Sequence, residues 1–283
     1  MLPTLGERPR VWPVFLGFAG ALFLMLVGNV ALLCVAALAI GKGTSGVDRF
    51  VTSLAGISAS AIVTVACLGA VSVGAGVLSR ERVVARLRLG PGRLSAPAIA
   101  SASFASLGAS VAFSLGCDIA GLKEGGVLAE VTRAVLEAPT AHFAGALLAL
   151  AVGPALGEEI FFRGFAQTRL EARWGRWIAV AIASALFGLV HLDPKQGSFA
   201  FAAGLWLGFV ASRAGSVRPS MIVHCVNNAG SLLLARFGLA PATAGGRAVM
   251  CGAAILIMIL GIVGTILQSR EPRDGGDHSR NVA

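Results

Sequence analysis

Two adjacent carboxylates, Glu158 and Glu159, lie in the apolar stretch PALGEEIFFRGF. A charged side chain near the centre of a bilayer costs roughly 2.5–3.5 kcal/mol on insertion scales, so an adjacent pair in such a stretch indicates a function. Arg163 follows Glu159 by four residues, which places both side chains on one face of a helix and predicts an ion pair. Glu158 then has no partner in its own helix, which makes it the candidate for chemistry.

Two later apolar segments contain further polar groups at helical spacing. Phe187 and His191 are four residues apart, as are His224 and Asn228. Side chains four residues apart share a face of a helix. Ionisable residues inside a membrane face the bundle interior and mark functional sites. We therefore expect the three segments to bring these groups together in a single site.

The chemistry that this set of residues could perform is hydrolysis of a peptide bond, which needs an activated water and donors for the oxyanion. We expect Glu158 to be the general base, because burial disfavours a charged carboxylate and makes it a stronger base. His191 would orient the water or protonate the leaving amine, and His224 and Asn228 would donate hydrogen bonds to the oxyanion. Three further residues would have supporting roles: Glu159, Arg163 and Phe187.

The three motifs, in this order and with this spacing, resemble those of the CPBP (Abi) family of intramembrane proteases, which includes the eukaryotic endopeptidases that trim prenylated CAAX proteins. The segment EEIFFRG is similar to the first motif of that family. The resemblance covers about residues 141–235. It implies a glutamate-dependent endopeptidase in which the matching residues have the roles given above: Glu158, His191, His224 and Asn228.

The composition indicates an all-α, polytopic transmembrane bundle. Hydrophobic residues make up 56% of the 283 residues and charged residues 13%, about half the fraction of a soluble domain. Several apolar runs exceed the roughly 18 residues that signal a transmembrane helix. The net charge is +9, but the arginines lie in short connections between apolar runs. The positive-inside rule explains this placement, so we expect a lipid bilayer as partner and no nucleic acid.

About eight spans are expected, with both termini in the cytoplasm: 14–40, 51–78, 97–116, 141–174, 177–192, 199–212, 219–235 and 248–267. The connection 79–93 carries five arginines and is expected in the cytoplasm, facing anionic headgroups. Arg236 and Arg247 are exceptions, since they fall on the outer side. Leu128, Val131 and Val135 recur at helical spacing and predict a short interfacial helix within 118–139.

Three regions are expected along the chain: N-terminal helices over 1–140, a catalytic core over 141–235, and a last span with a polar tail over 236–283. The richness in Ala, Gly and Arg is typical of a GC-rich bacterial genome, which favours a multi-pass protein of the bacterial inner membrane. The first apolar run is too long for a cleavable signal peptide. Five scattered cysteines are expected to be buried apolar residues rather than disulfides or metal ligands.

The depths of the candidate residues in the membrane pose a question. Glu158 precedes Trp174 by sixteen residues, whereas His224 follows Pro219 by only five. At 1.5 Å per residue, His224 should be shallower than Glu158. Either the connection 213–219 enters the bundle or the seventh span begins elsewhere. Gly204 and Gly208 in the sixth span have the GxxxG spacing that permits close helix packing.

Three alternatives to a glutamate-dependent protease without a cofactor remain open. Glu158, His191 and His224 could form a His₂Glu zinc site, a common catalytic arrangement. The polar cavity could instead serve a membrane immunity or scaffold protein that binds a peptide without cleaving it. A transporter is a third possibility, although the sequence shows no inverted repeat. In the preferred interpretation the substrate is a membrane-associated peptide or protein.

Overall fold

The structure is a computed structural model that describes residues 9–40, 44–79, 81–122 and 126–269. Across these ranges the chain forms helices joined by short connections and contains no strand, which confirms the all-α fold. The elements are α1 (Trp12–Ile40), α2 (Thr44–Val51), α3 (Leu54–Val77), α4 (Val83–Arg86), α5 (Ala96–Ile119), α6 (Gly126–Glu137), α7 (Thr140–Leu147), η1 (Leu148–Val152), α8 (Gly153–Glu159), η2 (Ile160–Gln167), α9 (Thr168–Trp174), α10 (Arg176–Leu189), α11 (Pro194–Ala214), α12 (Arg218–Arg236) and α13 (Ala244–Gln268).

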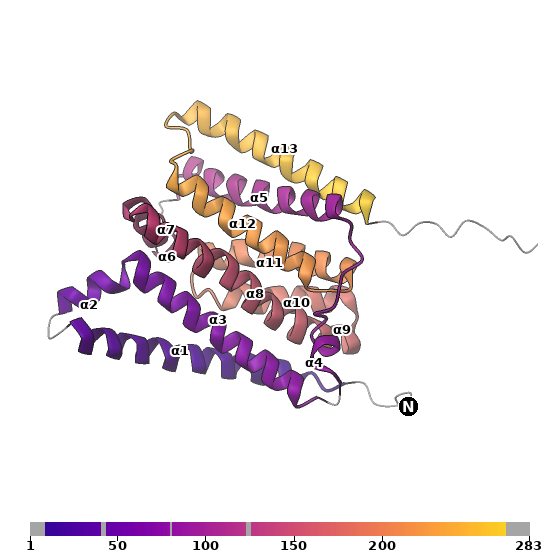
Figure 1. The fold of residues 1–283 in the computed structure, drawn as a ribbon. Coiled ribbons are helices and arrows are strands. Elements are labelled where there is room, and N and C mark those ends of the chain that lie inside the picture. Colours follow the sequence, from indigo (N-terminus) through magenta and orange to yellow (C-terminus); the bar gives the residue numbers. More distant parts are fainter. Residues whose placement is uncertain (1–8, 41–43, 80, 123–125, 270–283) are drawn as a thin grey trace, which may run out of the picture.

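The helix that carries the adjacent glutamates lies in the middle of the bundle (Figure 1). It runs without a break from Thr140 to Trp174, as expected, and includes two π-helical segments, η1 and η2. α3 packs against α8 and η2, and α1 lies outside α3. On the other side α12 packs against α8 and against α5, and α5 carries α13 on its outer face. The hairpin of α10 and α11 completes the bundle.

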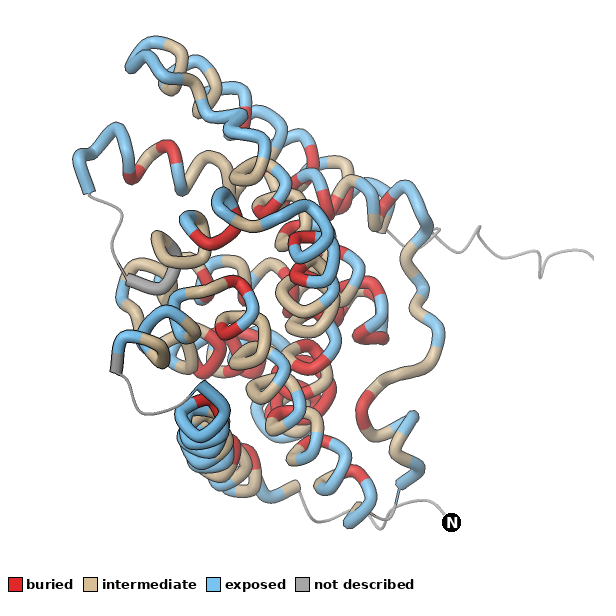
Figure 2. Tube along the Cα trace, turned by 60° about the vertical axis from the view of Figure 1, so that its left-hand side comes forward, coloured by how far each residue is buried: buried red, intermediate tan, exposed pale blue. Residues whose placement is uncertain are grey.

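The outer helices present apolar side chains outward. Leu16, Phe23 and Leu38 of α1 are all exposed, and Figure 2 shows buried positions concentrated in the interior of the bundle. Exposed apolar surface of this extent is unfavourable in water but suits contact with lipid tails. Among the described residues, five helical stretches are long and apolar enough to cross a membrane: Trp12–Ile40, Leu54–Val77, Ala96–Ile119, Thr140–Trp174 and Ala244–Gln268. The protein is therefore a multi-pass membrane protein.

Each of the eight expected spans corresponds to a helical stretch of the structure, with ends that differ by a few residues. The three that do not meet the membrane criterion are α10, α11 and α12. α10 has only 14 residues, and α12 includes the two arginines at its ends together with His224 and the two asparagines. The expected short helix within 118–139 is α6, and its Val135 is buried against the rest of the bundle.

Residues 81–93 of the connection pack in part on the protein, while Glu81, Arg82, Val84 and Ala85 are exposed. That this connection faces headgroups stays a prediction. Leu87 is fully buried beside Gly164, whose missing side chain leaves room for the Leu87 backbone. Hydrogen bonds join residues 88–93 to the connection between α11 and α12. They are Arg93 N to Ala214 O (2.9 Å), Val217 N to Arg88 O (3.1 Å), Ser216 Oγ to Gly90 O (2.6 Å) and Arg218 Nε to Leu89 O (2.7 Å).

Two arginines of this connection also hold the end of α9. Arg86 Nη1 donates to Thr168 Oγ1 at 2.9 Å, and Arg88 Nη1 lies 2.7 Å from Glu171 Oε2. Burial, followed by the nearby positive charge of Arg169, lowers the pKa of Arg86. The connection therefore forms a cover over this end of the bundle, which we call the arginine-rich end.

The start of α1 and the end of α13 lie at the arginine-rich end, on the same side as α4 (Figure 1). The two exceptional arginines lie at the opposite end and have local partners. Arg236 Nη1 donates to the carbonyls of Val135 and Leu136, and Arg247 Nη1 donates to the carbonyl of Ala242 at 2.8 Å. Cations commonly satisfy the free carbonyls at helix ends, as Arg236 does at the end of α6, and Arg247 bonds to the connection before α13. Both arginines therefore have a role apart from topology.

The charge distribution predicts that the arginine-rich end faces the cytoplasm. We expect a Val84→Cys variant, altered at an exposed position of α4, to react with a membrane-impermeant maleimide only after the membrane is permeabilised. The five native cysteines must first be replaced, and labelling in intact spheroplasts is the measurement. Reaction of Val84→Cys before permeabilisation would reverse the topology.

Candidate active site

The expected ion pair between Glu159 and Arg163 is present in the centre of the bundle. Arg163 Nη1 lies 2.9 Å from Glu159 Oε1, and both side chains are almost completely buried. Glu159 ends α8, and Arg163 lies in the π-helical segment η2. π-helical turns inside α-helices occur frequently at functional sites.

Arg163 and Gln167 join this helix to α11. Arg163 Nη2 donates to Gly204 O at 3.2 Å, and Gln167 Nε2 donates to Gly208 O at 3.1 Å and to Ser212 Oγ at 2.9 Å. A Cβ atom at Gly204 would lie 2.9 Å from Ser184 Cβ, and one at Gly208 would lie 2.9 Å from Gln167 Oε1. The GxxxG pair thus permits the close approach that the sequence predicts and opens two backbone carbonyls to buried donors.

Gln167 was not among the residues predicted from the sequence. Its side chain is fully buried, and Glu159, Arg163 and Gln167 form a row at four-residue spacing on one face. That spacing within an apolar segment is the signal that could have identified Gln167.

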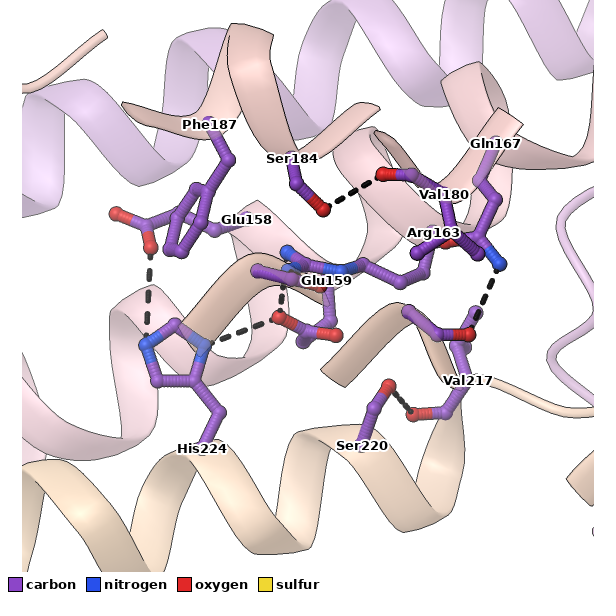
Figure 3. A network of polar contacts seen from close by, with 12 residues as sticks. Glu158, Glu159, Arg163, Gln167, Val180, Ser184, Phe187, Val217, Ser220 and His224 are labelled. Carbon is purple, nitrogen blue, oxygen red and sulfur yellow. Dashed lines mark hydrogen bonds and ion pairs between the residues drawn. The ribbon is translucent and has the colours of Figure 1, made fainter. Parts of the chain in front are cut away.

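His224 lies between the two adjacent carboxylates (Figure 3). Its Nδ1 is 3.1 Å from Glu159 Oε1, and its Nε2 is 3.8 Å from Glu158 Oε2. Because a carboxylate accepts hydrogen bonds, Nδ1 carries the hydrogen and donates a hydrogen bond to Glu159. Glu159 therefore does more than neutralise Arg163, since the same oxygen also orients the His224 ring. The sequence did not predict this contact.

The contact between His224 and the glutamates answers the question of depth. Glu158 is sixteen residues from the end of α9, whereas His224 is six residues from Arg218 at the start of α12. The first residues of α12 therefore lie deeper in the bundle than the end of α9. Ser216 and Val217 are buried, and the connection 213–219 enters the bundle beneath the cover.

His191 follows the end of α10 and is half-buried. Its Nδ1 lies 2.8 Å from the carbonyl oxygen of Phe187, which can only accept a hydrogen bond. In the neutral imidazole, Nε2 is then left as an acceptor for a further partner. The ring of Phe187 meets that of His191 edge to face at 5.1 Å and that of His224 at 5.9 Å. It also lies 4.6 Å from the Arg163 guanidinium, so Phe187 packs as expected.

Asn228 lies one helical turn beyond His224 on α12. Its Nδ2 is 3.4 Å from Leu150 O in the π-helical segment η1, and its Oδ1 is 3.4 Å from Asn227 Nδ2. Both distances are at the long limit for a hydrogen bond, so these contacts are weak. Asn227 accepts a hydrogen bond from Ser106 Oγ at 3.2 Å and joins α12 to α5.

These residues border one cavity with a volume of 1110 Å³. The predicted residues that line it come from three elements: Glu158, Phe187, His191, His224 and Asn228. Glu159 and Arg163 are fully buried behind this lining. The structure thus brings four candidate catalytic residues to a single cavity and places the ion pair where it supports them.

The remaining candidate features are metal-ligating side chains and the five cysteines. Among the described residues, no group of three or more His, Cys, Asp or Glu side chains is arranged to hold a metal ion. All five cysteines are unpaired, as expected. Cys117 is buried, but Cys34 is exposed on α1, so the expectation of burial is wrong there.

Buried carboxylate and histidine side chains beside a cavity, within apolar helices, mark a functional site in a membrane protein. Residues 140–230 match the family described as type II CAAX prenyl endopeptidase Rce1-like, which confirms the resemblance to the CPBP family drawn from the motifs. A comparison with curated proteins found no match. The family match supports a CAAX-type intramembrane protease and implies a membrane-associated protein substrate.

Proposed function

We propose that this protein is an intramembrane endopeptidase that hydrolyses a peptide bond with a water activated by Glu158. The observation that carries the proposal is the position of Glu158 on the cavity wall, with His224 Nε2 3.8 Å from its Oε2. At that distance the two side chains do not hydrogen-bond to each other, so a water or a substrate oxygen beside them in the cavity could contact both. Glu158 is also the glutamate without an ion-pair partner in its helix.

In the proposed reaction Glu158 takes a proton from the water, and the hydroxide attacks the substrate carbonyl. The acceptor Nε2 of His191 orients the same water. As the tetrahedral intermediate collapses, the proton held by Glu158 passes to the leaving amine, so atoms and charge balance.

The developing oxyanion would be stabilised from α12. Asn228 Nδ2 makes only a long contact with Leu150 O, so a substrate oxygen can compete for it. Glu159 accepts a hydrogen bond from His224 Nδ1 and so holds the ring with Nε2 directed toward Glu158 and the cavity, where it could contact the oxyanion. Removal of one such donor in other enzymes costs about 10²–10³ in rate.

The division of the chain into N-terminal helices, a core over 141–235 and a C-terminal span stays a prediction, as does a location in the bacterial inner membrane. In this proposal α1, α3, α5 and α13 enclose the core and provide its contact with lipid.

The proposed mechanism predicts that cleavage by the purified protein in detergent survives prolonged treatment with EDTA and 1,10-phenanthroline. The protein should also contain less than stoichiometric zinc by elemental analysis. If zinc held by Glu158, His191 and His224 activated the water, a chelator would abolish cleavage and added zinc would restore it. Loss of cleavage with the chelator and its recovery with zinc would show that the protein is a metalloprotease.

A further inference from the structure

The cavity beside Glu158 extends toward the end of the bundle opposite the arginine-rich end. Beyond Glu158, in the direction of the arginine-rich end, the interior is filled by Phe161, Phe162 and Phe165, which are fully buried. In the other direction the lining continues to the last residues of α5, to α6 and to the turn after α2, at the end of the bundle opposite α4 and α9 (Figure 1). Thr52 and Asp118 in that part of the lining are exposed.

A row of polar side chains on α5 runs along the cavity, from the level of the active site toward the end of the bundle opposite α4 and α9. Ser106, Ser110, Ser114 and Asp118 recur at four-residue spacing, so they share one face, and all four line the cavity. Two of them join polar residues of α12: Ser106 Oγ lies 3.2 Å from Asn227 Oδ1, and Ser110 Oγ lies 3.0 Å from Ser231 Oγ. Three serine hydroxyls of the apolar helix α5 therefore lie along the cavity wall.

The length and polarity of this row fit an extended polypeptide. Twelve residues of helix rise about 18 Å, which matches about five residues of an extended strand at roughly 3.3 Å each. An extended segment within the membrane must satisfy each backbone N–H and C=O, because lipid offers no hydrogen bonds. A serine hydroxyl has one O–H donor and two acceptor lone pairs. Ser106 already donates to Asn227 Oδ1 and can still accept from a backbone N–H, whereas the free hydroxyl positions of the row can serve either backbone group.

We infer that the polar row of α5 is a subsite for an extended segment of a membrane-associated polypeptide, which enters from the membrane face opposite the arginine-rich end. This inference rests on the proposed function, since it names how the substrate of that site approaches. With the arginine-rich end in the cytoplasm, the substrate enters from the non-cytoplasmic face. Water reaches Glu158 along the same route.

The entry side can be tested by cysteine labelling in a background in which all five native cysteines are replaced by serine. We expect Ser114→Cys to react in intact spheroplasts with a charged, membrane-impermeant maleimide. Phe104→Cys is the matched control on the same helix, because Phe104 is exposed on the outer surface and is absent from the cavity lining; it should not react. Val84→Cys marks the arginine-rich end and should react only after permeabilisation.

Labelling of Ser114→Cys solely after permeabilisation, or on neither side, would overturn the inference. Ser110→Cys provides the same test if Ser114→Cys does not accumulate. A second measurement follows cleavage: modification of Ser114→Cys should reduce turnover at least tenfold, whereas the same treatment of Phe104→Cys leaves turnover unchanged. If the labelling pattern holds but the unmodified protein cleaves nothing, the route stands and the proposed function fails.

Discussion

Glu158→Gln abolishes cleavage, with a loss of about 10²–10⁴-fold, while the protein accumulates to the wild-type level. The loss follows because general-base catalysis contributes a factor of that order, and a glutamine cannot accept the proton from water. Abundance is kept because Glu158 lines the cavity, and its ion-pair contact among the described residues is the long one with His224 Nε2 at 3.8 Å. Turnover of a membrane substrate and immunoblotting of the membrane fraction are the two measurements.

Glu171→Gln is the matched control for this prediction. Glu171 lies in α9 on the same long helix, and its ion pair with Arg88 is partly exposed at the arginine-rich end. Exposed ion pairs contribute about 0–1 kcal/mol, so this variant should retain both cleavage and abundance. If Glu158→Gln keeps substantial cleavage, Glu158 is not the base.

Glu159→Ala should fail to accumulate, in contrast to Glu158→Ala. Removing Glu159 leaves the Arg163 guanidinium completely buried, with Gly204 O as its remaining hydrogen-bond partner among the described residues. It also removes the acceptor that orients His224. Breaking a buried ion pair on one side costs roughly 3–5 kcal/mol, which is a large part of the stability of a typical protein. Abundance in the membrane and the midpoint of thermal unfolding in detergent measure the effect.

A double variant separates the cost of an unpaired charge from the loss of a side chain. Replacing a whole buried ion pair by apolar residues is often neutral, so Glu159→Leu with Arg163→Met should accumulate better than Glu159→Ala alone. The double variant should nevertheless remain inactive, because His224 loses its orienting partner. Equal abundance of Glu159→Ala and Glu158→Ala would contradict the different roles assigned to the adjacent glutamates.

The positions of the spans could be predicted from the sequence because they depend on local hydrophobicity. The stretch from Thr140 to Trp174 and the helices α1, α3, α5 and α13 all begin and end within a few residues of the expected positions. The Glu159–Arg163 pair could be predicted for a similar reason, since i, i+4 geometry holds in a single helix. The convergence of Glu158, His191, His224 and Asn228 followed from the cost of polar groups in lipid.

The features that the sequence did not predict depend on contacts between distant segments. The hydrogen bonds between 88–93 and the start of α12 decide the depth of His224, and no periodicity within α12 reveals them. The contact of His224 with Glu159 joins residues 65 positions apart. The π-helical segments η1 and η2 shift backbone hydrogen bonds in ways that residue type alone does not indicate.

The most direct test of proteolysis by Glu158 is a comparison of new peptide termini in membranes of cells that express either the wild type or Glu158→Gln at equal abundance. Mass spectrometry of labelled termini would identify each cleavage. We predict termini, within or next to membrane-spanning segments of other proteins, that are present with the wild type and with Glu171→Gln and absent with Glu158→Gln. Identical sets of termini in all three membranes would contradict the account and favour a protein that binds polypeptides without cleaving them.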